Sequence, residues 1–297
     1  MKSKFSILIV LILAAGFAGG CGPNASGAGS LYTTNVPVLE VEGLHFAPAR
    51  AVNDQKINFS PLKPPPAPKP AIVTRILGKS RQGKSISMTV FGKTGPTLLV
   101  FAGIHGNEPR SVAVAKKLDA ELRANRDLVQ SCRVALISCV SPDGLALNSR
   151  YNATGTIDLN RNFPARSFTK RDPRCGPAPA SEPETKCVLA AVSALSPKAI
   201  ISIHTCDRRR PGSTRDRHGN NWDGKGKALA DAMARHNRYR SFGEWHNKTP
   251  GSFGSYANDN GLCVVTLEIP NDVSASAAWT ANRGALIEAI RYTRSSR

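Results

Sequence analysis

The chain has 297 residues, of which 41% are hydrophobic and 21% are charged. This composition can bury one sizeable core or two small ones, which excludes an intrinsically disordered protein. The 40 lysines and arginines outnumber the 21 acidic residues and give a net charge of +19. The basic residues are spread along the chain instead of forming one tail, so the surface should attract polyanions.

An export signal is predicted at the N-terminus. Two early lysines precede an apolar stretch at 5–17, which is shorter than the roughly 20 residues that a membrane-spanning helix needs. The tetrapeptide AGGC at 18–21 resembles a bacterial lipobox. We therefore expect 1–20 to be a lipoprotein-type signal peptide and Cys21 to carry lipid. The alternative is an ordinary secretory peptide in which this cysteine is incidental.

Export would place the mature chain in the cell envelope, held at a membrane by lipid on Cys21, with the periplasmic face expected. The polyanions found there are cell-wall polymers and membrane headgroups, so nucleic acid is not an expected partner. Six further cysteines permit disulfides in an exported protein. Cys175 and Cys187 flank one proline-rich polar loop and form the single pair that we expect. The sequence gives no indication of an oligomeric state.

The chain divides into a tether and one domain. Residues 21–70 show little periodicity and end in SPLKPPPAPKP, where closely spaced prolines favour an extended backbone. The segment VPVLEVEGLHF at 36–46 is apolar enough to leave open a structured extension that packs on the domain. Residues 71–297 are expected to form the single folded domain.

Strands and amphipathic helices alternate in this domain, with an irregular region from 143 to about 180. In chain order we predict a strand pair at 71–80 and 85–92, a strand at 96–103, a helix at 109–125, a strand at 133–142, a helix at 181–195, a strand at 198–205, a helix at 224–237, a strand at 262–270 and a helix at 276–295. Buried strands that alternate with helices predict an α/β fold with a mixed, mostly parallel sheet covered on both faces.

Polar side chains stand where three apolar strands end. His105 and Glu108 follow the strand FAGI, His204 ends KAIISI, and Glu268 lies inside VVTLEIP. The carboxyl ends of such strands form the binding crevice of an open sheet. Two imidazoles and a carboxylate, with a fourth position left for water, form a catalytic zinc site. Burying Glu268 is costly unless it has a partner or a role.

The motifs HGNE, SPDG, SRYNATGTIDLNRNFP, SIHT and TLEIP occur in an order that resembles the zinc metallocarboxypeptidases related to carboxypeptidase A. The resemblance extends from about Ser85 to the C-terminus and implies a zinc carboxypeptidase-like α/β fold. DLNRNFP, HGNEP and PGSFGSYAND resemble the bacterial murein peptide amidase branch most. Those enzymes hydrolyse the bond between γ-D-glutamate and diaminopimelate in peptidoglycan peptides, which would make such a peptide the substrate.

The resemblance implies how the reaction would be divided among the site residues. One zinc ion would be bound by His105, Glu108 and His204. Glu268 would be the general base and then the general acid, which requires no covalent acyl-enzyme. Asp158 would hold the ring of His105 by its other nitrogen.

Substrate recognition is implied in the same way. Asn160 and Arg161 would grip the free carboxylate of the substrate, and Arg150 would stabilise the developing oxyanion. Tyr256 would be the aromatic residue that closes over the substrate. Asn107 stands where the digestive carboxypeptidases have an arginine, which weakens any expectation of their ordinary C-terminal specificity.

Two alternatives stay open. The motifs HGNEP and DLNR also occur in N-acyl amino acid deacylases related to succinylglutamate desuccinylase and aspartoacylase, which are typically cytoplasmic. A catalytically inactive, lipid-anchored relative that binds the envelope would have lost a ligand or the base, and this sequence has both.

Overall fold

The computed structural model describes residues 71–207, 217–243 and 249–295, which lie within one compact unit. The predicted signal peptide, Cys21 and the tether lie outside these residues. Within the described ranges, no helix is long and apolar enough to cross a membrane.

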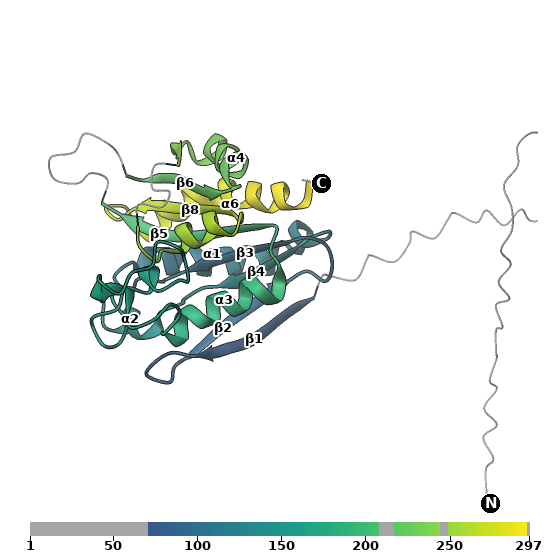
Figure 1. Ribbon diagram of the computed structural model, residues 1–297. Coiled ribbons are helices and arrows are strands. Elements are labelled where there is room, and N and C mark those ends of the chain that lie inside the picture. Colours follow the sequence, from purple (N-terminus) through teal and green to yellow (C-terminus); the bar gives the residue numbers. More distant parts are fainter. Residues whose placement is uncertain (1–70, 208–216, 244–248, 296–297) are drawn as a thin grey trace, which may run out of the picture. The chain divides into compact units, whose positions relative to one another are not determined.

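One eight-stranded sheet forms the centre of the domain (Figure 1). The order across it is β1-β2-β4-β3-β5-β8-β6-β7. The central strands β4, β3, β5 and β8 run parallel. Strands β1 and β2 pair antiparallel to their neighbours, and β6 pairs antiparallel with β8 and parallel with β7. The strand bounds are Ile72–Lys79 for β1, Ser85–Phe91 for β2, Thr97–Ala102 for β3, Arg133–Ile137 for β4, Ala199–Cys206 for β5, Gly219–Gly224 for β6, Ser241–Phe242 for β7 and Cys263–Pro270 for β8.

Helices cover both faces of the sheet, which confirms the predicted fold class (Figure 1). On one face, the alternate residues of β3, β5 and β8 pack against helices α1 (Pro109–Ala124), α4 (Lys227–Asn237) and α6 (Ala275–Ser295). On the other face they pack against α3 (Pro183–Leu195) and α5 (Phe253–Asp259). Side chains two residues apart on a strand share a face, so Ser202 and His204 lie on the α3 and α5 side with Ile200.

The irregular region contains short helical pieces only. These are α2 (Pro142–Ala146) and the 3₁₀ turns η2 (Leu159–Arg161) and η3 (Pro173–Cys175), while η1 (Arg126–Val129) follows α1. Besides these short pieces, three elements were not predicted: β6, β7 and α5. The sequence of β6, GNNWDG, has no strand pattern of its own, and it becomes a strand because it pairs with β8.

The expected disulfide between Cys175 and Cys187 is wrong. All six cysteines of the described residues are free. Cys187 belongs to the core between α3 and the sheet, where its Sγ lies 2.8 Å from the position of a Cβ on Gly78. Cys175 instead ends η3, and its carbonyl accepts a hydrogen bond from Asn162. Proximity to the same loop in sequence therefore does not bring the two sulfurs together.

Candidate metal centre

Three of the predicted site residues converge at the carboxyl end of the sheet. Strand β3 ends at Ala102, and the turn after it places His105 and then Glu108, which is the residue before α1. Strand β5 places His204 beside them. One donor atom from each of the three lies within 4.8 Å of the others, and the residues are only 2%, 5% and 4% exposed.

The turn between β3 and α1 depends on a glycine. A Cβ on Gly106 would lie 1.8 Å from the carbonyl carbon of Gly144 in α2. No side chain fits there, because atoms that are not bonded to each other do not approach so closely. The glycine of HGNE therefore allows the ligand turn to pack directly on the backbone of SPDG, two motifs that are far apart in the sequence.

The Glu108 carboxylate lies between the two imidazoles. Its Oε1 is 2.6 Å from Nδ1 of His105, its Oε2 is 3.1 Å from Nδ1 of His204, and the backbone N–H of Thr205 donates to Oε2 at 3.0 Å. Burial alone raises the pKa of Glu108, but the two histidines outweigh burial and hold that pKa well below its usual range. The carboxylate is therefore ionised, as a metal ligand must be.

His105 is held from both sides. Its Nε2 lies 3.0 Å from Oδ1 of Asp158, so Nδ1 is the nitrogen that faces Glu108 and His204. Burial lowers the pKa of His105, but the carboxylates of Glu108 and Asp158 outweigh it and raise the pKa to about 9. Two imidazole nitrogens and one carboxylate oxygen in a buried group fit one zinc ion, which would displace only the proton on each ring nitrogen that it binds.

Asp158 is a fully buried carboxylate that joins His105 to Arg150. Its Oδ2 accepts from Arg150 Nε at 3.0 Å, and its Oδ1 accepts from the backbone N–H of Asn160 at 2.9 Å. Arg150 Nη1 lies 3.4 Å from Nδ1 of His105 and 3.9 Å from Oε1 of Glu108. The structure therefore brings the arginine that is expected at the oxyanion to the edge of the ligand group.

Asn160 and Arg161 form η2 with Leu159. Asn160 Oδ1 accepts from the backbone N–H of Phe253, the first residue of α5, which orients the amide. Arg161 Nη1 donates to the carbonyl of Asn160, whereas its Nε is buried and has no hydrogen-bond partner among the described residues. Burial is the main cause that lowers the pKa of this guanidinium. A buried donor without a partner is suited to an anionic group of a ligand.

Glu268 lies on β8 at the position paired with His204 on β5. It is 8% exposed, and burial raises its pKa, with a further increase from Glu108 and a decrease from His204. The carboxylate is therefore beside the ligand group without belonging to it.

Tyr256 lies on α5 and is half-buried. Its ring centroid is 6.0 Å from that of Phe253 and 6.3 Å from that of Phe163, so the ring packs against the core under this helix. Ser252 caps the same helix by accepting from the backbone N–H of Ser255. Asn107, in the turn between β3 and α1, is exposed.

Sequence reasoning did not identify the Thr205 N–H as a partner of Glu108, because a backbone donor has no sequence signal.

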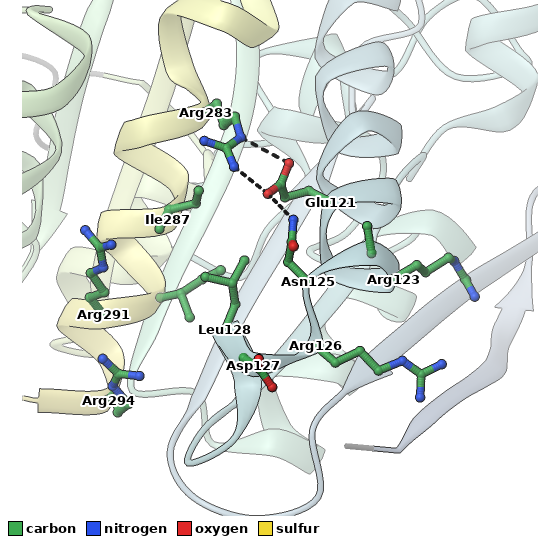
Figure 2. A pocket seen from close by; sticks show the side chains of 12 residues that line it. Glu121, Arg123, Asn125, Arg126, Asp127, Leu128, Arg283, Ile287, Arg291 and Arg294 are labelled. Atoms are coloured by element: carbon green, nitrogen blue, oxygen red, sulfur yellow. Dashed lines mark hydrogen bonds and ion pairs between the residues drawn. The ribbon is translucent and has the colours of Figure 1, made fainter. Parts of the chain in front are cut away.

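A separate pocket of about 590 Å³ lies at the other end of α1, away from the ligands (Figure 2). The last turn of α1, the turn η1 and helix α6 line it. Its arginines are largely matched by acids: Arg283 pairs with Glu121 at 2.6 Å, and Arg291 lies 3.7 Å from Glu288. It contains none of the predicted site residues.

The fold and the buried histidine–glutamate–histidine group define a metal-dependent hydrolase of the α/β class. The sequence profile of the zinc carboxypeptidase family matches residues 67–266, and the chain belongs to this family. As a member it hydrolyses peptide or amide bonds, and the family implies the zinc that the three ligands fit.

Known relatives agree with this assignment. Murein peptide amidase A of Escherichia coli K12 is 30% identical over 187 residues, which cover 58% of this chain and 70% of the relative. The crystal structure of murein-tripeptide amidase MpaA from E. coli O157 has a TM-score of 0.59 and 25% identity, and covers 78% of this chain and 97% of that one. Carboxypeptidase A from Helicoverpa armigera has a TM-score of 0.63 at 15% identity over 76% of this chain and 69% of its own, which shows the shared fold.

Proposed function

We propose that this protein is a zinc-dependent hydrolase of peptidoglycan stem peptides and cleaves the amide between γ-D-glutamate and diaminopimelate. The observation that carries the proposal is the 30% identity to a murein peptide amidase, over a segment that covers 70% of that enzyme. The buried ligand group and the base beside it supply the chemistry that such a cleavage needs.

His105, Glu108 and His204 would hold the zinc ion. Zinc supplies Lewis acidity, which activates water and polarises a carbonyl group. Asp158 fixes the ring of His105 so that Nδ1 stays directed at the other two ligands. Every other step falls to side chains of the chain itself.

Glu268 would take a proton from the attacking water and then give it to the leaving amine. Its position beside His204 places the carboxylate within the same buried site, and burial limits competition from bulk water. The same residue acts as base and then as acid, so the site needs no second titratable group for proton transfer.

Two arginines would divide the recognition of negative charge. Arg150 lies next to the ligand group, where charge develops on the carbonyl oxygen during attack. Arg161 would bind the free carboxylate of the diaminopimelate residue, with Asn160 beside it. The unused Nε of Arg161 supports this role, because a fork of two N–H groups suits a carboxylate.

The site also bears on the inactive alternative. A relative without turnover would be expected to lack a ligand or the base, whereas here the three ligands form one buried group and Glu268 is paired with His204 beside it. For localisation, we propose an exported protein held at the cell envelope by lipid on Cys21, which would place the enzyme near its substrate.

The test uses purified mature protein and the tripeptide L-Ala-γ-D-Glu-diaminopimelate, with products separated by mass. We expect cleavage before diaminopimelate that a chelator abolishes and added zinc restores. Cleavage of ordinary C-terminal peptides instead of the tripeptide would contradict the proposed substrate. Glu268→Gln should retain stoichiometric zinc and lose turnover, and an active variant would contradict the role of the base.

A further inference from the structure

The loop at 149–162 carries the side chains of Arg150, Asp158 and Arg161, yet its one helical piece is the three-residue turn η2. A segment without regular backbone pairing holds side chains in place only when other contacts fix it. A buried network around Asn152 and Glu182 provides these contacts.

Asn152 folds the first half of the loop back on itself. The side chain is fully buried, and its Oδ1 accepts from the backbone N–H groups of Thr154 at 3.2 Å and Ile157 at 3.3 Å. The backbone N–H of Asn152 donates to the carbonyl of Ile157 at 2.9 Å. The resulting compact turn is what returns the chain so that Arg150 lies beside Asp158, with 3.0 Å between Nε and Oδ2.

Glu182 holds both ends of this loop. Asn152 Nδ2 donates to its Oε2 at 2.6 Å, and the backbone N–H of Glu182 donates to Oδ1 of Asn162, the residue after Arg161, at 3.1 Å. The Glu182 carboxylate is fully buried, and Arg81 compensates its charge with Nε and Nη2, each 3.0 Å from one carboxylate oxygen. A buried carboxylate without such partners would be strongly destabilising.

We propose that Glu182, with Arg81 as its counter-ion, is a positioning residue for the catalytic loop and acts through Asn152 on Arg150 and Asp158. Arg81 belongs to the turn between β1 and β2, 101 residues before Glu182, and lies outside the motifs of the site.

Removing Arg81 leaves the carboxylate of Glu182 with fewer donors, so the carboxylate is expected to shift towards water or to other donors. Asn152 then loses its fixed partner, and the loop holds Asp158 less firmly against His105. The effect on catalysis rests on the proposed function, whereas the effect on zinc affinity does not require a substrate.

A matched pair of variants tests the proposal. Arg81 and Lys84 lie on the same turn, their side chains are 42% and 43% exposed, and each pairs with a fully buried carboxylate, Glu182 at 2.9 Å and Asp143 at 3.3 Å. Of these two cations, Arg81 is the one bonded to the network. Arg81→Ala and Lys84→Ala therefore share the loss of an ion pair and differ in the link to the loop.

The measurements are zinc affinity by competition with a chromogenic chelator, Tm of the metal-free proteins, and kcat and KM on the tripeptide. We expect Arg81→Ala to weaken zinc binding roughly tenfold and to lower kcat more than it raises KM, as for other residues that orient a metal ligand. Lys84→Ala should retain the zinc affinity of the parent even where the two variants lose similar Tm.

Glu182→Gln adds a second check, because Arg81→Ala should then have little further effect. Equal losses of zinc affinity in Arg81→Ala and Lys84→Ala would overturn the proposal. So would a full Arg81→Ala effect in the Glu182→Gln background. A parent protein that does not cleave the tripeptide would count against the proposed function, and the difference in zinc affinity would still decide the role of Glu182.

Discussion

The variant Asp158→Asn should distinguish the effect of Asp158 on the zinc ligand His105 from its effect on the stability of the loop. Asp158 accepts four bonds: from His105 Nε2 at 3.0 Å, from Arg150 Nε at 3.0 Å and Nη2 at 2.9 Å, and from the Asn160 N–H at 2.9 Å. An amide has one oxygen, so its NH₂ group must face either the arginine or the imidazole. One of these two contacts is lost in either orientation, and the negative charge beside the imidazole of His105 is lost in both.

The size of the loss follows from the bonds. A hydrogen bond to a charged group contributes roughly 1.5 to 3 kcal/mol. Residues that orient a metal-bound histidine typically change metal affinity by about 10- to 100-fold, which corresponds to about 1.4 to 2.8 kcal/mol. We therefore expect zinc binding to Asp158→Asn to weaken by a factor within this range, measured by chelator competition at fixed pH.

Asp172→Asn is the matched control. Asp172 caps η3 as Asp158 caps η2, by accepting from a backbone N–H two residues later, and it pairs with Arg174 at 2.7 Å. The hydrogen bonds to its carboxylate come from Arg174, from the backbone N–H, Nε and Nη2. Both variants lose a helix cap and an ion pair with an arginine. Asp158 alone of the two contacts His105, so zinc affinity should fall in Asp158→Asn and not in Asp172→Asn. An Asp158→Asn protein that binds zinc within twofold of the parent would refute the idea that this carboxylate orients His105.

Three further changes have defined outcomes. Gly106→Ala should lower the free energy of unfolding, measured by denaturant titration, by about 3 kcal/mol, because its Cβ would lie 1.8 Å from the Gly144 backbone. The control is Gly284→Ala in α6, whose Cβ makes ordinary van der Waals contacts, and it should be neutral or stabilising. Burial raises the pKa of Glu184, so the folded chain binds that proton more tightly than the unfolded chain and stability falls as pH rises above about 4.5. Glu184→Gln should therefore raise Tm at pH 7 and lose this advantage below pH 4.5; an equal gain at both pH values would contradict the assignment. Cys21→Ser should abolish incorporation of labelled palmitate into the protein expressed in bacteria, and continued labelling would contradict lipidation at this residue.

The parts of the fold that sequence predicted are those whose signal is local. Strands β3, β5 and β8 are largely apolar runs, and α1 begins with Pro109 and repeats buried residues at helical spacing. Strand β6 and helix α5 depend on contacts instead. A Cβ on Gly254 in α5 would lie 2.5 Å from Oδ2 of Asp223 in β6, so this helix and strand pack closely where neither has a strong pattern of its own.

Two buried glutamates of the candidate site show the same contrast between a local sequence signal and a dependence on long-range contacts. Glu268 attracted attention in the sequence because it interrupts an apolar strand, where a charge is unusual and has to be explained. Glu182 is buried more completely, but it stands immediately before α3, where acidic residues are common because the helix N-terminus favours negative charge. Its sequence context therefore predicts an ordinary helix start. What distinguishes it are Arg81 and Asn152, partners 101 and 30 residues away, which only the folded chain brings together. Residues that bind or react at a site can thus be inferred from unusual local chemistry, whereas residues that hold those groups in place look ordinary until their long-range contacts are known.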